Sequence, residues 1–187
     1  MSSTRRATGH RLRALRFLFF SDESMKTKPT IEDPRTHPYQ FFLSDAIQQG
    51  QLLEQLIGFT GRASILVTSF STAEEFLMKC WRLKREGLID RATILLDIKA
   101  VEKTARIRSM IGGVFDRQLF APNHSKCMVI QGEDMTVTTL CSQNTTRGGR
   151  LESYVITTDP QAARAVEDAL EQLAAFTIDN NANPTTP

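Results

Sequence analysis

Four side chains in the second half of the sequence are of types that can hold and attack a phosphoryl group. His124 and Lys126 are two residues apart, and so are Ser142 and Asn144. An imidazole can attack phosphorus, while lysine and amide N–H donors neutralise the charge that develops on the phosphate oxygens. A single histidine is more often structural or merely exposed than catalytic, so the interpretation of His124 as a nucleophile depends on its neighbours.

These side chains flank a predicted β-hairpin. Residues 126–130 and 135–140 are apolar runs of strand length, and the polar residues 131–134 between them are typical of a turn. Side chains two residues apart share one face of a strand. We therefore expect the hairpin to bring the histidine, the lysine, the hydroxyl and the amide together at one end of a sheet.

The elements that must position this hairpin alternate between strands and helices. Further strands are predicted at 64–69, 92–96, 114–120 and 154–157. Helices are predicted over 44–58, over 71–86 with a capping box of Ser71 and Glu74, over 102–110 with a stop at Gly112 and Gly113, and over 159–176. Strand–helix–strand order indicates right-handed parallel crossovers. The prediction is an α/β fold with a mixed sheet flanked by helices.

The length of 187 residues and the ordinary globular composition predict a single domain. We expect a basic arm and linker at 1–38, the domain at 39–178 and a polar tail at 179–187. The first twenty residues hold five arginines and no acid, whereas the rest holds 18 basic and 21 acidic residues. Such arms commonly contact nucleic acid or an acidic membrane surface. A solvated leader and a true start at Met25 are the alternatives.

The cysteines and the hydropathy pattern bear on the compartment. Cys80, Cys127 and Cys141 show no metal-type spacing, which favours free thiols in a cytoplasmic protein. No apolar run approaches the length needed to span a bilayer, so we expect a soluble protein without membrane insertion. No acidic metal cluster accompanies the four candidate residues, so we expect chemistry that needs neither metal nor cofactor.

Two short segments, His124-Ser125-Lys126 and Cys141-Ser142-Gln143-Asn144, resemble the motif of the phospholipase D superfamily. That motif reads His-x-Lys, four residues, Asp, and a little later Gly-Ser-x-Asn. The layout over residues 41–176 is similar as well. The resemblance implies that His124 forms a phosphohistidine, while Lys126, Ser142 and Asn144 bind phosphate oxygens. It also implies that an acid after the asparagine, here Glu152, holds the other nitrogen of the histidine and stabilises the imidazolium.

The sequence departs from the motif at two positions. Gln131 stands where the family has aspartate, and Cys141 stands where it has glycine. Glu133 or Asp134 is expected near the position that Gln131 leaves vacant. Neither departure removes the nucleophile or the phosphate-binding side chains.

The family mechanism needs two histidines, whereas one motif supplies one. An isologous two-fold interface would place the same patch of two subunits face to face, so we predict a homodimer with two copies of His124 in a shared site. The leading hypothesis is a metal-independent phosphodiesterase that acts as a nuclease on DNA or RNA. The alternatives are a phospholipase D-like protein that binds nucleic acid without cleaving it, and a phospholipid phosphodiesterase.

Overall fold

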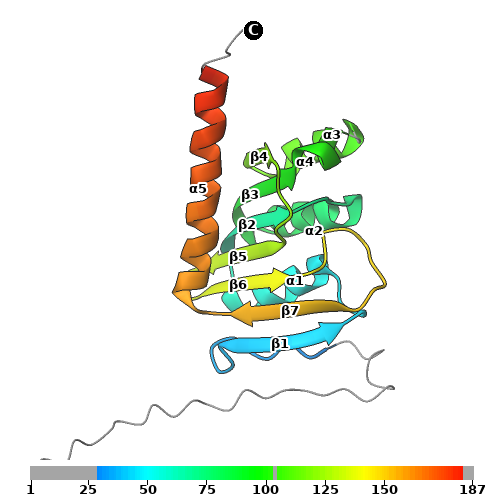
Figure 1. Cartoon of the computed structure of the whole chain (residues 1–187). Helices are drawn as coiled ribbons and strands as arrows, with labels where there is room; N and C mark the ends of the chain where they lie inside the picture. Colours follow the sequence, from blue (N-terminus) through cyan, green and yellow to red (C-terminus); the bar gives the residue numbers. More distant parts are fainter. Residues whose placement is uncertain (1–28, 103–104, 183–187) are drawn as a thin grey trace, which may run out of the picture.

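The computed structural model describes residues 29–102 and 105–182. The arginines of the predicted basic arm, the alternative start at Met25 and the end of the predicted tail lie outside these residues. The described chain forms one seven-stranded sheet with helices on both faces (Figure 1). Its elements are β1 (Tyr39–Ser44), α1 (Gln49–Thr60), β2 (Ala63–Ser69), α2 (Glu74–Arg85), β3 (Ile89–Asp97), α3 (Ile98–Glu102), α4 (Ala105–Val114), β4 (Arg117–Ala121), β5 (Cys127–Gly132), β6 (Thr136–Cys141), β7 (Glu152–Thr157) and α5 (Pro160–Ala182).

The sheet is mixed, as the sequence predicts. Its strand order is β1-β7-β6-β5-β2-β3-β4. The strands β2, β3 and β4 are parallel and are joined by crossovers through α2 and through α3 and α4. The other pairs are antiparallel, including the hairpin of β5 and β6 in which Cys127 pairs with Leu140. The predictions of the crossovers and the hairpin are therefore confirmed.

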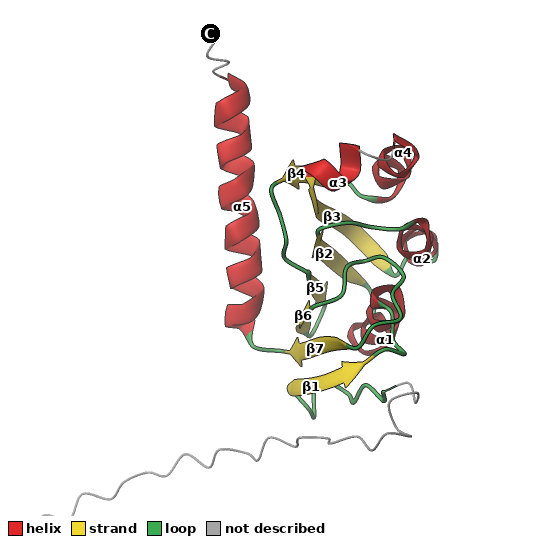
Figure 2. Cartoon of the chain, turned by 45° about the vertical axis from the view of Figure 1, so that its right-hand side comes forward, coloured by secondary structure: helices red, strands yellow, loops and turns green. Residues whose placement is uncertain are grey.

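The sheet divides the interior into two unequal layers. Helices α1, α2 and α4 cover one face, where Leu53, Leu77 and Ile111 are fully buried (Figure 2). Helix α5 lies over the opposite face and buries Leu170 against Leu95 and Ala121 (Figure 2). Burying apolar side chains of this size stabilises the fold by about 1.5–3 kcal/mol each. Most of this stabilisation lies on the face that α1, α2 and α4 cover.

The predicted beginning of the first helix is wrong. Ser44 ends β1, a strand that the sequence analysis missed, and α1 begins only at Gln49. There Gln51 accepts a hydrogen bond from the backbone N–H of Gln48 at 3.2 Å. Residues 39–44 are extended because they pair along the whole length of β7, where Ser44 is opposite Glu152.

The predicted capping box of Ser71 and Glu74 is also wrong. Helix α2 begins at Glu74, and its N-cap is Ala73, which has no side-chain oxygen to offer. The backbone N–H of Ala73 instead donates to the carbonyl of Thr145 at 3.1 Å. A tertiary contact at this position therefore replaces the local cap that the sequence pattern indicates.

Three further boundaries differ from the predictions. Two helices, α3 and α4, replace the single one expected over 102–110, and Gly112 and Gly113 do not stop α4. Glycine in a helix costs only about 1 kcal/mol, and the buried Ile111 and Val114 on either side offset that cost. Helix α5 continues to Ala182, past the helix end at 176 that the sequence predicts. Among the described residues, no helix combines the length and apolar character needed to cross a membrane.

Candidate active site

The structure places His124, Lys126, Ser142 and Asn144 at one edge of the sheet. His124 lies in the connection from β4 to β5, and Lys126 directly precedes β5. Ser142 directly follows β6, and Glu152 begins β7. The two halves of the motif are adjacent because the backbone N–H of Cys141 donates to the carbonyl of Lys126 at 3.0 Å.

The residues on either side of His124 fix its loop to the end of β2. The side-chain amide of Asn123 donates to the carbonyl of Ser69 at 3.0 Å. Its Oδ1 accepts the backbone N–H of Ser125 at 3.0 Å and the hydroxyl of Ser125 at 2.6 Å. The backbone N–H of Asn123 donates to Asp97 at 2.9 Å, and this bond holds the pKa of Asp97 below its usual value. His124 itself is exposed while its backbone is held on both sides.

Lys126 lies against the imidazole of His124. Its ammonium donates to the carbonyl of His124 at 2.8 Å and lies 3.3 Å from Nδ1 of the ring. An ammonium can only donate, so Nδ1 accepts and the proton of the neutral ring is assigned to Nε2. The ring of Phe70 packs beside the imidazole, with 5.5 Å between the centroids.

No carboxylate of the described residues pairs with the charge of Lys126. The side chain is 9% exposed, and within the described chain no carboxylate lies within 4.0 Å of its ammonium. A buried cation without a counter-ion is costly, because little water remains to solvate it. This edge of the sheet is therefore suited to receiving an anion.

The second half of the motif is arranged differently from what the resemblance implies. The hydroxyl of Ser142 donates to Glu152 and accepts the backbone N–H of Ser153 at 3.0 Å. Within the described chain, no hydrogen bond joins Glu152 to His124. The orienting role of Glu152 therefore stays a prediction. Asn144 lies close by, with its Oδ1 at 3.4 Å from the hydroxyl of Ser69.

Gln143 supports the Ser-x-Asn segment, a role that the sequence alone does not reveal. Gln143 is 3% exposed, and its Oε1 accepts the N–H of Gln49 at 3.2 Å and the hydroxyl of Tyr154 at 3.0 Å. Its side-chain amide donates to Gln48 at 3.1 Å. The only signal in the sequence is a glutamine inside a motif, because Gln48 and Gln49 are far away along the chain.

Comparisons with known proteins rest on structure rather than sequence. No family model and no curated protein sequence matches the chain. Polyphosphate kinase from Porphyromonas gingivalis superposes with a TM-score of 0.61 at 11% identity, over 83% of this chain and 29% of that chain. NucT from Helicobacter pylori superposes with a TM-score of 0.55 at 14% identity, over 73% of this chain and 95% of that chain. Both belong to the phospholipase D superfamily.

The chain has the phospholipase D fold. It spans less than a third of the polyphosphate kinase chain, at 29%, but nearly the whole of NucT, at 95%. The fold places the His-x-Lys and Ser-x-Asn segments on neighbouring ends of β5 and β6. The likeness therefore covers the architecture around the motif.

The two departures from the phospholipase D motif lie in different surroundings. Gln131 pairs with Thr136 far down the hairpin, and its side chain donates to Glu167 of α5. Glu133 and Asp134 lie in the turn after β5, and the expectation that one of them takes the place of the motif aspartate stays a prediction. That turn is at the end of the hairpin away from His124.

Cys141, the second departure from the motif, forms hydrogen bonds with Gln49 and Gln143. Its thiol donates to the carbonyl of Gln143 at 3.2 Å and accepts the side-chain amide of Gln49. Burial raises the pKa of Cys141 to about 12. The thiol is therefore neutral, and its contacts are structural.

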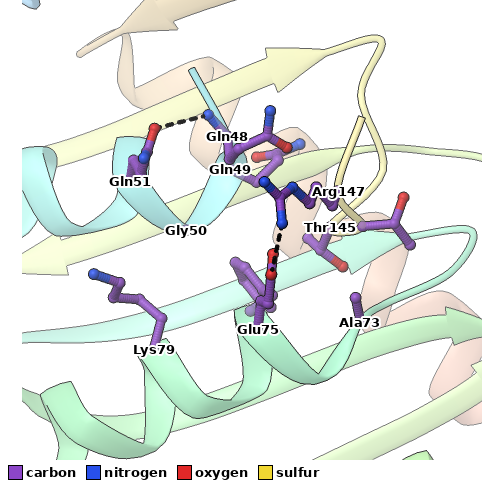
Figure 3. A pocket seen from close by; sticks show the side chains of 11 residues that line it. Gln48, Gln49, Gly50, Gln51, Ala73, Glu75, Lys79, Thr145 and Arg147 are labelled. Carbon is purple, nitrogen blue, oxygen red and sulfur yellow. Dashed lines mark hydrogen bonds and ion pairs between the residues drawn. The ribbon is translucent and has the colours of Figure 1, made fainter. Parts of the chain in front are cut away.

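A pocket lies beside the phospholipase D motif at the same edge of the sheet (Figure 3). It lies between the first turns of α1 and α2 and the segment after Asn144, with Gln48, Lys79 and Arg147 among its lining residues. Arg147 reaches across to Glu75 at 3.4 Å. Within the described residues, no group of three histidine, cysteine or acidic side chains is arranged to hold a metal ion.

Proposed function

We propose that the protein is a phosphodiesterase of the phospholipase D type that cleaves nucleic acid through His124. The observation that carries this proposal is the buried residue Lys126, whose ammonium lies beside an exposed imidazole and pairs with no carboxylate of the described residues. A phosphate oxygen would supply the missing negative charge and would put phosphorus within reach of the ring. Asn144 would donate to a remaining oxygen, and Ser142 would do so once its hydroxyl leaves Glu152.

The proposed reaction has two steps. A nitrogen of His124 attacks phosphorus, and the bond from phosphorus to the leaving oxygen breaks as a second imidazole gives that oxygen a proton. Water then attacks the phosphohistidine, returns a proton to the second imidazole and frees His124. Neither step requires a metal ion. Because one chain supplies one such histidine, the proposal includes a homodimer with a shared site.

The hydrogen bonds around His124 determine which nitrogen of its ring is free to attack phosphorus. Attack through Nε2 needs the ring proton on Nδ1, where a carboxylate would accept it. In the single chain Nδ1 faces Lys126, and Glu152 is engaged by Ser142. Binding of phosphate to Lys126 would release Nδ1, and a second subunit would bring a second copy of Glu152 to the site.

Three observations support nucleic acid as the substrate. The motif resembles that of single-motif nucleases in the superfamily. The sequence before Met25 is rich in arginine and could neutralise backbone phosphates. NucT is a nuclease, and the structural likeness to it covers 95% of that chain.

A second candidate is a protein that binds nucleic acid without cleaving it. It is favoured by Gln131, which occupies the place of the motif aspartate and donates to Glu167 on α5. In that case Lys126 and Asn144 would still bind phosphate, while His124 would have no chemical role.

The test is cleavage in EDTA. Plasmid DNA, single-stranded DNA, RNA and a phosphatidylcholine emulsion are incubated with the wild type, with His124→Ala and with the control His37→Ala. His37 is exposed, and its ring contacts Thr36 outside the site. We expect the wild type and His37→Ala to cleave nucleic acid, and His124→Ala not to cleave it. In the two active proteins, rapid quenching should trap an acid-labile phosphoprotein. Equal cleavage by the His124 variant would refute the mechanism, and a monomer by sedimentation at micromolar concentration would refute the shared site.

A further inference from the structure

The segment between Asn144 and Glu152 starts and ends at the candidate site. It carries Arg147 and Arg150, and both side chains are exposed. We propose that these two arginines bind backbone phosphates of the nucleic acid next to the phosphate held by Lys126, and that Glu75 weakens this binding by competing for Arg147. This inference rests on the proposed function, because it names the path of that substrate.

The first part of the segment is fixed to the end of β2. The backbone N–H of Thr145 donates to the hydroxyl of Ser69 at 3.0 Å, and its own hydroxyl donates to the carbonyl of Ser71 at 3.1 Å. Thr145 also forms a parallel bridge with Thr72. Arg147 therefore projects from a backbone that is held only two residues earlier.

The middle of the segment is held by one glutamine. Gln48 donates through its side-chain amide to the carbonyl of Gly148 at 2.8 Å, and its Oε1 accepts the N–H of Gly148 at 3.1 Å. The same Oε1 accepts the amide of Gln143. Both backbone polar groups of Gly148 are thus bonded to Gln48, which also holds Gln143 of the Ser-x-Asn segment. Arg147 and Arg150 flank this anchored point, so their positions relative to the site are set by the backbone.

The charges near Arg147 allow it to change partners. Its contact with Glu75 is long, at 3.4 Å, and the two side chains are 80% and 67% exposed. Exposed pairs of this kind bind weakly. The nearby Lys79 is already engaged by Glu54 at 2.6 Å, which also contacts Arg82. Glu75 is therefore the acid whose removal frees Arg147 without disturbing Lys79.

Arg150 has no ion pair within the part of the chain that the structure describes. Guanidinium groups match phosphate through two parallel N–H donors. On the proposed path, these two groups and Lys126, which pairs with no carboxylate of the described chain, would form a row of cationic positions along this edge. A polyanionic strand fits such a row better than a single small anion does.

The test measures binding separately from cleavage. Full-length protein with His124→Ala is titrated into fluorescein-labelled single-stranded and duplex DNA at several salt concentrations. We expect Arg147→Ala and Arg150→Ala to weaken binding and each to reduce the salt slope by about 1. Glu75→Gln should tighten binding by roughly two- to fivefold, because it removes a weak exposed pair. The matched controls are Arg164→Ala and Asp168→Asn, exposed charges on α5 that should leave binding unchanged.

The outcomes separate this inference from the proposed function. Suppose that the wild type cleaves in EDTA but the two arginine variants bind with the same salt slope as Arg164→Ala. Phosphate binding by Arg147 and Arg150 is then refuted, while the proposed phosphodiesterase activity is supported. If the wild type does not cleave but both arginine variants have a reduced salt slope, the proposed phosphodiesterase activity is refuted and nucleic-acid binding by Arg147 and Arg150 is supported. Absence of any salt-dependent retention overturns the inference. Binding to anionic vesicles in place of nucleic acid overturns the assignment of the partner.

Discussion

Replacement of Asn123 by alanine tests whether the loop around His124 is held for catalysis. The substitution removes three side-chain hydrogen bonds, one to the carbonyl of the buried Ser69 and two from Ser125. Ser125 is exposed and regains its bonds from water, whereas the carbonyl of the buried Ser69 loses the hydrogen bond from Asn123. A buried polar group without a partner costs about 1–3 kcal/mol. We expect a loss of about 2 kcal/mol, which corresponds to a fall in Tm of roughly 4–8 °C in a chain of this size.

The expected effect on catalysis is larger than this loss of stability implies. A displacement of a reacting group by about 1 Å from its productive position can lower the rate by about a hundredfold. The variant keeps only the backbone bond of residue 123 to Asp97, so the loop around His124 is held less firmly. We expect kcat to fall at least tenfold, while KM changes little because Lys126 and Asn144 remain. The assay is phosphodiesterase kinetics in EDTA, at a temperature where every variant is folded by circular dichroism.

Gln40→Ala is the matched control for this experiment. Its side-chain amide also makes three hydrogen bonds, to Glu32 in both directions and to the carbonyl of His37. It lies near the start of β1, at the opposite end of that strand from Ser44. Gln40→Ala should lower Tm and leave kcat unchanged. Equal losses of kcat in both variants, or a change of less than twofold in the Asn123 variant, would contradict the reasoning.

Three further predictions concern pH, thiol reactivity and the motif departures. The folded pKa of Asp97 is depressed by backbone N–H donors, so its contribution to stability is present above its unfolded pKa and is lost as pH falls through the lower folded pKa; acid titration of Asp97→Asn followed by fluorescence should lack this component, and an unchanged profile would exclude it. Desolvation raises the pKa of the buried Cys80 and of the partly buried Cys127 and Cys141, so all three thiols should react slowly with Ellman's reagent until denaturant is added; fast reaction of the native protein would contradict the raised pKa values. Gln131→Asp should place a second carboxylate beside Glu167 and lower Tm slightly without raising activity, and a gain in kcat would show that this position reaches the site.

The parts of the fold that the sequence predicts are those with local signals. The hairpin of β5 and β6 is recognisable because two apolar runs flank a polar turn, and the crossovers follow from the alternation of strands and helices. Strand β1 has no such signal, since it follows a proline-rich stretch. It is a strand because Phe42 and its neighbours pair with β7, whose Tyr154 stacks on Phe42 with centroids 5.0 Å apart.

The candidate site divides in the same way. The spacing of His124 with Lys126, and of Ser142 with Asn144, is visible in the sequence and places them at one edge. The hydrogen bonds that position them join residues far apart along the chain, such as Asn123 with Ser69 and Gln143 with Gln48. The contact of Glu152 with Ser142 depends on where β7 begins, which periodicity alone locates only approximately.

Ser69 at the end of β2 contacts both halves of the motif. Its carbonyl accepts the amide of Asn123, and its hydroxyl accepts the N–H of Thr145. For protein engineering, this means that the motif is not a transplantable hairpin: a graft of β5 and β6 into another scaffold would carry the reactive groups but lose their shared support. In evolution, the side chains of Asn123 and Ser69 are constrained jointly, since the amide of Asn123 binds the Ser69 carbonyl and the hydroxyl of Ser69 binds the N–H of Thr145.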